Sequence, residues 1–365
     1  MQTLTTGHWW GGEEAEMGEE QVARGPASRG EASPALLHAL RERYGLTGES
    51  AKDLGGSSNL NLLVEGPGGQ EPYVVRVYRP WVTPERLADM QLVRWRLAEG
   101  GVPAALPVPT VDGEQWIVVD GRLVEVEPYV EHDAKMDTWE RIEAALPLLG
   151  RIHTLLQPLQ LSIEGRNPPA SNNIEPRDAL PGTLRGIAQI RQWSNASQIE
   201  LELAGASEEL ARLVDRAQQG FEELPRQLVH GDYWDNNVLF RDGDIVLVAD
   251  FDFMVERAQI DDLALTLYYI NSTFSDDRAS TGRIRRLRAL VDAYDSGLDE
   301  RLTSVERAAL PLALARAPLA FIAMIAAADS GAVARRLAAE MAPDVAWALA
   351  IARNLARWQA AFARD

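Results

Sequence analysis

The spacing of apolar positions divides the chain into two parts with different periodicities. Between about residues 46 and 131, short runs such as "NLNLLVEG", "PYVVRVY" and "RLVEVEPYV" carry apolar residues at the spacing of half-buried β-strands. Beyond residue 131 the apolar residues return at helical spacing over longer segments, as in "TWERIEAALPLLGRIHTLLQ". The pattern predicts an α+β protein with two lobes, the first β-rich and the second mainly helical.

Local start and stop signals refine the first lobe. A helix is expected over "TPERLADMQLVRWRLAEGG", with Thr83 as its N-cap, Pro84 at its first position and Gly100 at its end. Asp120-Gly121 is expected to join two strands as a hairpin turn. Residues 1–32 are rich in glycine and glutamate and predict a disordered or loosely attached tail. The expected division is therefore 1–32, 33–131 and 132–365.

The second lobe contains strand patterns in one region. "NVLFRDG" and "DIVLVADFD" are expected to pair as a hairpin across Asp242-Gly243, after a short strand "QLVHGD". The proline-rich residues 167–182 are expected to form a loop, and helices are expected over about 183–194, 199–220 and much of 261–365. A single hairpin within a helical lobe indicates a specialised site.

Charge and composition exclude several classes of function. The chain has 365 residues, no cysteine and a formal net charge of −18. An acidic surface does not favour nucleic-acid binding, which releases counterions from phosphates through basic residues. It is compatible with a cationic small-molecule partner, although acidity also serves solubility. Without cysteine, disulfides, zinc–thiolate sites and thiol nucleophiles are excluded.

The longest apolar stretch predicts a buried helix rather than a membrane span. Residues 308–328 are interrupted by Pro311, Arg316 and Pro318. The first twenty residues have neither the basic nor the apolar region of a signal peptide. We therefore expect a cytoplasmic protein with no membrane partner, either a monomer or a homodimer.

Candidate chemistry gathers at the expected hairpin of the second lobe. Asn237 begins its first strand and Asp250 ends its second, so a tight turn would bring both residues to the open end. An amide and a carboxylate supply oxygen ligands for a hard cation such as Mg²⁺. Asp232 lies on the loop just before and would leave a carboxylate free to face a substrate hydroxyl. This division of roles suits phosphoryl transfer.

Three motifs in this region resemble those of the aminoglycoside phosphotransferase family, which includes choline kinases and type II homoserine kinases. "HGDYWDNN" resembles its catalytic loop, "VADFD" the segment with its second metal ligand, and "IDDLALTLYY" the helix start that supports the loop. The resemblance covers about residues 50–365 and implies a bilobal protein-kinase-like fold. It implies that Asp232 is the catalytic base, that Asn237 and Asp250 bind the metal, and that Asp262 supports the loop. His230 is expected to be a hydrogen-bonding scaffold of the loop.

The nucleotide-binding residues are expected in the first lobe, for ATP or GTP as phosphate donor. Gly56, Ser57, Ser58 and Asn59 form a polar turn in which backbone and side chains could approach phosphate. The resemblance places Arg76 where protein kinases carry a phosphate-binding lysine, and arginine binds phosphate well through its planar fork.

The partner of Arg76 and the connector between lobes are less specified by the sequence. The helix position that carries a glutamate in the family holds Gln91 here, and Glu85 is an alternative partner. The resemblance also places the backbone from Glu127 to Val130, including Tyr129, at the adenine edge.

The leading interpretation is a Mg²⁺-dependent phosphotransferase that transfers the γ-phosphate of ATP or GTP to a small-molecule hydroxyl. An aminoglycoside or amino-sugar-like acceptor is favoured, because acidic and aromatic residues would suit amines beside a hydroxyl. These candidate acceptor residues are Tyr233, Trp234, Asp235, Asp252 and Glu256. A small amino alcohol such as homoserine or choline is the alternative acceptor. An inactive nucleotide-binding regulator and a protein kinase are competing classes, and the second is disfavoured by the short segment between "DFD" and "DDLA".

Overall fold

The structure is a computed structural model that describes residues 29–46, 51–56, 59–219, 221, 224–274, 280–328 and 330–364. Most of the expected tail, residues 1–28, lies outside this range. The chain folds into two compact units. Unit 1 contains the described residues up to Met136, together with Gln160–Pro169 and Asp235–Asp252. Unit 2 contains Asp137–Leu159, Ala170–Trp234 and the residues from Phe253 onward.

Unit 1 is built on an antiparallel five-stranded sheet of order β1-β2-β3-β5-β4. It also holds a three-stranded sheet of order β6-β8-β9. The strands are β1 (Lys52–Asp53), β2 (Leu60–Val64), β3 (Tyr73–Val77), β4 (Ile117–Val119), β5 (Arg122–Pro128), β6 (Ala134–Lys135), β8 (Val238–Arg241) and β9 (Asp244–Val248). The helices are α1 (Pro34–Tyr44), the 3-10 helix η1 (Pro67–Gly69), α2 (Pro84–Glu99) and α4 (Ile163–Arg166).

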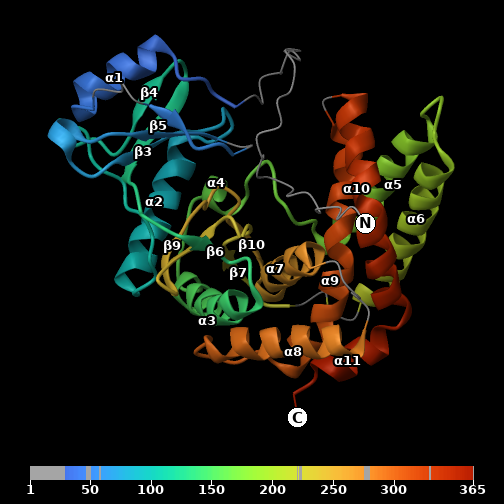
Figure 1. The fold of residues 1–365 in the computed structure, drawn as a ribbon. Helices are drawn as coiled ribbons and strands as arrows, with labels where there is room; N and C mark the ends of the chain where they lie inside the picture. Colours follow the sequence, from blue (N-terminus) through green and yellow to red (C-terminus); the bar gives the residue numbers. More distant parts are fainter. Residues whose placement is uncertain are drawn as a thin grey trace, which may run out of the picture. The chain divides into compact units, whose positions relative to one another are not determined.

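The two faces of the five-stranded sheet differ in chemistry. Alternate residues of a strand point to opposite faces, and Val75 and Val124 face α1 within a core that includes Leu36 and Leu40. The intervening residues of β3 and β5 include Arg76 and face α2, the helix on the other side of the sheet (Figure 1). Unit 1 therefore has one apolar and one charged sheet face.

Helices α1 and α2 of unit 1 begin and end at recognisable capping residues. Thr83 caps α2 by accepting a hydrogen bond from the backbone N–H of Arg86, with Pro84 in the first turn and Gly100 at the C-cap. Ser33 caps α1 in the same way, and Gly45 ends it in the left-handed region, at φ 70°.

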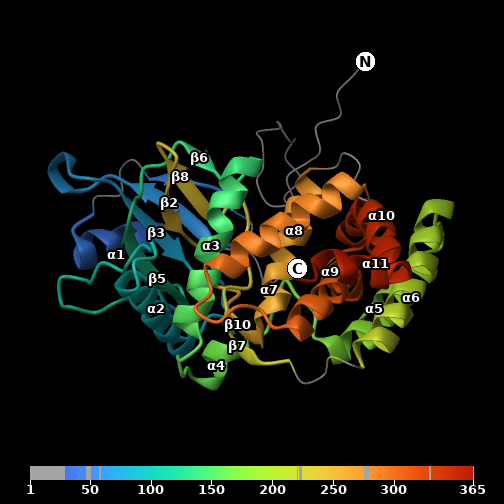
Figure 2. The same cartoon turned by 90° about the horizontal axis from the view of Figure 1, so that it is seen from below.

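Unit 2 is mainly helical, with a two-stranded sheet in which β7 (Arg226–Val229) pairs with β10 (Val255–Ala258). Figure 2 shows the helix α9 among α5, α6, α10 and α11. The helices are α3 (Trp139–Leu156), α5 (Pro176–Arg191), α6 (Gln198–Gln218), α7 (Gln259–Thr273), α8 (Thr281–Ser296), α9 (Ser304–Met324), η2 (Ile325–Ala327), α10 (Gly331–Arg353) and α11 (Leu355–Phe362).

The long apolar helix is a core element of unit 2, as predicted. Ser304–Ala327 is apolar enough to cross a membrane by length and composition, and 83% of its most apolar 18-residue window is buried inside the protein.

The loop expected over residues 167–182 was wrong in its second half. Helix α5 begins at Pro176, where proline is favourable because the first turn needs no backbone donor, and it continues through Pro181.

Candidate active site

The hairpin predicted to carry the metal ligands is present in unit 1. Strands β8 and β9 pair antiparallel with Val238 opposite Val248, and Asp242 and Gly243 form the turn with φ of 54° and 91°. Asn237 precedes β8, and its carbonyl oxygen accepts a hydrogen bond of 2.9 Å from the backbone N–H of Ala249. The open end of the hairpin therefore brings Asn237 next to the segment that carries Asp250.

Asp250 has an unusual backbone conformation and a side-chain oxygen without a hydrogen bond among the described residues. Its φ of 62° is in the left-handed region, which non-glycine residues rarely adopt and which aspartate tolerates better than most. Its Oδ1 lies 3.7 Å from Arg76 Nη1. The same oxygen is buried and has no hydrogen-bond partner within the described residues. A buried carboxylate oxygen in this state is a ready ligand for a cation.

Asp252, two residues later, is connected to the glycine-rich turn. It is 1% exposed, and its Oδ2 accepts a hydrogen bond from Asn59 Nδ2. The Oδ1 of Asn59 in turn accepts the backbone N–H of Arg79 at 3.1 Å. Burial, and then the neighbouring Asp250, raises the pKa of Asp252 to about 7. The sequence-based hypothesis placed Asp252 with the acceptor, whereas the structure buries it beside the nucleotide candidate Asn59.

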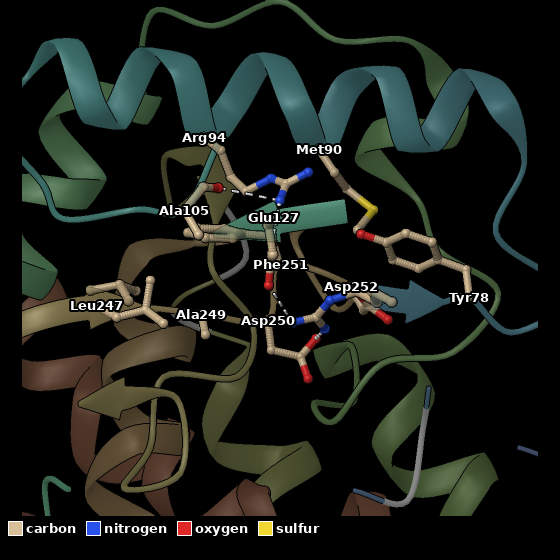
Figure 3. Close-up of a pocket in the computed structure, with 12 residues that line it drawn as sticks. Tyr78, Met90, Arg94, Ala105, Glu127, Leu247, Ala249, Asp250, Phe251 and Asp252 are labelled. Carbon is tan, nitrogen blue, oxygen red and sulfur yellow. Dashed lines mark hydrogen bonds and ion pairs between the residues drawn. The ribbon is translucent and has the colours of Figure 1, made fainter. Parts of the chain in front are cut away.

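The charged face of the sheet lines a pocket that contains Arg76 and its two carboxylate partners, Glu127 and Asp250. The lining residues include Arg76, Arg94, Glu127 and Asp250. Figure 3 shows Arg94 reaching from α2 toward Glu127, with Asp250 in the same pocket. Arg76 Nη2 lies 3.5 Å from Glu127 Oε1, so its carboxylate partners are on β5 and after β9.

Neither helix residue proposed as the partner of Arg76 takes that role in the observed ion pairs. Gln91 Nε2 donates a hydrogen bond of 2.8 Å to Glu125, a buried carboxylate on β5. Arg94 on α2 holds the same Glu125 through two bonds of 2.6 and 2.7 Å and also contacts Glu127 at 2.9 Å. At the helix position where the family pattern predicts an acid, this chain has Gln91; Arg94, three residues later, supplies a cation, and β5 supplies the two carboxylates.

Asp232 lies on the loop after β7 in unit 2. The side chain is buried, and its Oδ1 accepts a hydrogen bond of 2.7 Å from Asn172 Nδ2. Asn172 comes from the loop before α5, sixty residues earlier in the chain. A neutral amide donor orients the carboxylate without neutralising its charge, which keeps the group usable as a base.

A second buried carboxylate holds the loop itself. Asp262 accepts the backbone N–H groups of His230 at 3.1 Å and Gly231 at 3.0 Å, and it contacts His153 Nε2 at 2.9 Å. The ring Nδ1 of His230 accepts a hydrogen bond of 3.2 Å from the backbone N–H of Asp232, a contact within the loop. Gly231 has φ 77°, and a Cβ there would collide with the carbonyl oxygen of Phe253.

The other predicted residues are spread over both units. Gly56 adopts φ 97°, and the adjacent Ser57 and Ser58 lie outside the described residues. The backbone N–H of Tyr129 is hydrogen-bonded to Pro72 at 3.0 Å, so this donor is already used within the protein. Asp235 is half-buried in unit 1.

The remaining acceptor candidates lie in unit 2. Tyr233 is fully buried, and its hydroxyl donates a hydrogen bond of 2.8 Å to the carbonyl oxygen of Ala145. The ring of Trp234 lies 5.6 Å from that of Tyr269, and its buried Nε1 has no hydrogen-bond partner among the residues described. Glu256 on β10 lies 4.0 Å from Arg226. Burial, and then the charge of Asp232, raises the pKa of Tyr269 well above its usual range.

Sequence reasoning missed Asn172, Arg94 and Glu125. Asn172 lies in a proline- and asparagine-rich stretch with no periodic signal. Arg94 and Glu125 could have been predicted as site residues, because both are charged residues on the buried faces of their elements, α2 and β5. A buried charge requires a partner, and the alternation of side chains along β5 shows which face of the sheet Glu125 occupies.

Comparison with known sequences decides the family. The sequence profile described as the phosphotransferase enzyme family matches residues 51–302. The chain belongs to this family. A homoserine kinase from Gluconacetobacter diazotrophicus is 27% identical over 73% of this chain and 77% of its own length. One from Phenylobacterium zucineum is 27% identical over 73% of this chain and 76% of its own length.

Solved structures show the fold. An aminopropanol kinase associated with a microcompartment matches with a TM-score of 0.63 and 20% identity, over 90% of this chain and 98% of its own. An amicoumacin kinase in complex with AMP-PNP and Ca²⁺ matches with a TM-score of 0.62 and 15% identity, over 86% of this chain and 93% of its own. The predicted α+β bilobal, protein-kinase-like fold is confirmed, as is the prediction of a phosphotransferase enzyme of this family.

Proposed function

We propose that this phosphotransferase transfers the γ-phosphoryl group of ATP to the hydroxyl of a small amine-bearing molecule in a Mg²⁺-dependent reaction. The single observation that carries the proposal is the pairing of Arg76 with Asp250 in one pocket at 3.7 Å. A buried guanidinium suits a polyphosphate, and a carboxylate beside it suits the cation that accompanies the polyphosphate. Phosphoryl transfer relies mainly on such charge neutralisation and positioning.

The residues at the open end of the hairpin fit a divalent cation. Asp250 Oδ1 is buried without a hydrogen bond among the described residues, and Asn237 supplies an amide beside the same strand pair. Oxygen ligands of this kind are those that Mg²⁺ takes from proteins. When bound, the cation would neutralise charge on the phosphate oxygens. Asn237 and Asp250 would hold it, and Arg76 would hold the triphosphate.

Asp232 is the residue proposed to receive the acceptor proton. Its carboxylate is held by the Asn172 amide at 2.7 Å, and the loop that carries it is fixed by Asp262. A base oriented in advance lowers the cost of aligning the acceptor hydroxyl. We propose that Asn172 contributes by this orientation.

The acceptor we favour is a small amino alcohol of the homoserine type. The sequence alone favoured an amino-sugar acceptor, and the curated relatives shift the preference, because they are homoserine kinases at 25–28% identity. An aminoglycoside-like acceptor is the second candidate, since spectinomycin phosphotransferase and amicoumacin kinase share the fold. The choice of ATP rather than GTP, cytoplasmic location and a monomeric or dimeric state also remain predictions.

A nucleoside-diphosphate release assay tests the proposal. The purified protein would be assayed with ATP or GTP against homoserine, choline, aminopropanol, amino sugars and aminoglycosides, with Mg²⁺ or with a chelator. We expect acceptor-dependent release with an amino alcohol, abolished by the chelator. Absence of both acceptor-dependent release and Mg²⁺-dependent nucleotide binding would contradict the proposed function.

Two variants of the hairpin test the metal role separately. Asp250→Ala and Asn237→Ala should raise the Mg²⁺ concentration needed for turnover, because each removes one proposed ligand. Asp244→Ala is the matched control, since Asp244 is an exposed carboxylate at the closed end of the same hairpin. Unchanged Mg²⁺ dependence in both Asp250→Ala and Asn237→Ala would rule out these ligands.

A further inference from the structure

The guanidinium of Arg76 is shared between two carboxylates and is tightly bound to neither. Arg76 Nη2 lies 3.5 Å from Glu127 Oε1, and Nη1 lies 3.7 Å from Asp250 Oδ1. Arg94, in the same pocket, contacts Glu125 at 2.6 Å. Well-formed charged hydrogen bonds have lengths near that of the Arg94–Glu125 contact. Arg76 therefore lies between two acids with room to close onto either one.

The carboxylate of Glu127 cannot move with Arg76, because Arg94 binds its other oxygen. Arg94 Nη1 holds the Oε2 of Glu127 at 2.9 Å. Arg94 is itself held by Glu125, which also accepts hydrogen bonds from Gln91 and Tyr78. Each of these side chains is buried. The position of Glu127 is thus fixed by α2 and by its own strand.

We propose that Glu127 is a positioning residue that holds Arg76 away from Asp250 and so leaves the Asp250 carboxylate free for the divalent cation. This inference rests on the proposed function and deepens it, because it assigns a role to a side chain outside the proposed metal and phosphate ligands. It also accounts for Gln91. Glu127 on the strand takes the place of the family's helix glutamate as the partner of Arg76, and Gln91 instead donates a hydrogen bond to Glu125, which holds Arg94.

The physical basis is competition between two cations for one carboxylate. Opposite charges attract strongly where water is excluded, so Asp250 attracts Arg76 in the absence of the metal. With Glu127 neutralised, Asp250 becomes the nearest charged partner of Arg76 among its observed ion pairs. The guanidinium then closes onto Asp250, and the divalent cation has to displace it.

The test compares two glutamates on the same strand. Glu127→Gln and Glu125→Gln each remove one buried charge held by Arg94, but only Glu127 contacts Arg76 in the observed ion pairs. Binding of Mn²⁺, used in place of Mg²⁺, is measured by electron paramagnetic resonance with a saturating non-hydrolysable ATP analogue. We expect Glu127→Gln to weaken Mn²⁺ binding by about 10–100-fold, as is typical for residues that support metal ligands. Glu125→Gln acts on Glu127 only through Arg94, so it should lower thermal stability and weaken Mn²⁺ binding less than Glu127→Gln does.

A double variant tests the competition directly. Arg76→Gln in the Glu127→Gln background removes the competing cation, so Mn²⁺ affinity should recover while triphosphate affinity stays low. Should Glu127→Gln fail to fold, Glu127→Asp keeps the charge, retracts it from Arg76 and is expected to weaken Mn²⁺ binding less strongly.

The outcomes separate this inference from the proposed function. Equal losses of Mn²⁺ affinity in the Glu127 and Glu125 variants, or no loss in any Glu127 variant, would overturn the positioning role alone. A parent protein that binds neither Mn²⁺ nor the ATP analogue would overturn the proposed function and this inference together.

Discussion

Two buried carboxylates, one in each unit, are compensated in different ways. Asp262 in unit 2 accepts two backbone N–H groups and contacts His153, and Glu127 in unit 1 faces two guanidinium groups. Backbone donors belong to the loop that they fix, so Asp262 specifies one conformation of residues 230–231. A guanidinium on a long side chain can move to another acid. The first arrangement fixes the loop that carries Asp232, the proposed base, and the second leaves the guanidinium of Arg76 adjustable.

The difference suggests what each unit contributes to catalysis. A base misplaced by about 1 Å from the hydroxyl can cost about 10²-fold in rate, which favours a rigid loop. A phosphate-binding cation must respond to the arrival of nucleotide and metal, which favours a side chain with more than one partner. Substitutions in both units test this comparison.

The largest effect is expected from Asp232→Asn. The change keeps the shape and removes the charge that would receive the acceptor proton, a contribution of about 10²–10⁴-fold for general bases. Turnover should fall by that factor, while nucleotide affinity changes by less than about tenfold, or roughly 1.4 kcal/mol. Steady-state turnover beside equilibrium nucleotide titration measures both. Parental turnover in this variant would remove Asp232 from the mechanism.

Asp262→Asn should have the next largest effect. An amide can accept only one of the two backbone hydrogen bonds, because its NH2 group is a donor. A loop displaced by about 1 Å can lose about 10²-fold in rate. Asp344→Asn is the matched control, because Asp344 is a buried carboxylate of unit 2 that accepts a hydrogen bond of 2.8 Å from Tyr268. Both variants should melt at lower temperature, but only Asp262→Asn should lose turnover. Equal turnover in the two would mean that the loop does not depend on Asp262.

Arg76→Ala should weaken triphosphate binding by about tenfold or more, and Arg76→Lys by less, because lysine keeps the charge and loses the planar fork. Titration with a non-hydrolysable ATP analogue distinguishes them. Parental affinity in both variants would mean that Arg76 is only a strand residue.

The smallest effect concerns pH and Asp252. Burial raises its pKa to about 7 from an ordinary value of 3.8, so the folded protein keeps a proton that the unfolded chain releases. This contribution to stability is complete below about pH 4 and is lost as the pH rises through about 7. With chelator present, the melting temperature of the parent should therefore fall more between pH 5 and pH 8 than that of Asp252→Asn, by a few degrees. Parallel pH profiles would show that Asp252 does not titrate in this range.

How much the sequence could predict depends on how far apart along the chain the interacting residues are. The ends of α2 and the β8–β9 hairpin depend on caps and turn residues within a few positions, and both were predicted correctly. The partners of Arg76 depend on which strand lies beside β3 and on how far a helix arginine reaches. These are contacts over 33 to 51 residues that no local pattern contains.

The loop that carries Asp232 shows the same limit. Asp232 and Asp262 were proposed as site residues because they lie in recognisable motifs, whereas Asn172 reaches Asp232 from a loop with no motif. The proline-rich sequence before α5 predicted a loop up to residue 182. The helix begins at Pro176 because a proline at the first position needs no backbone partner.

The apolar sheet face under α1 has a consequence for how much of the chain is needed to fold. The family match begins at residue 51, after Leu36 and Leu40 have already contributed to the core of unit 1. It ends at residue 302, before α9, α10 and α11, and so leaves out a helix against which α5, α6 and α7 of the matched segment pack. A polypeptide trimmed to the matched residues would expose aliphatic surface at both ends and is expected to aggregate. The proposed catalytic motifs are contained within the matched segment, but we expect the autonomous folding unit to extend beyond it on either side.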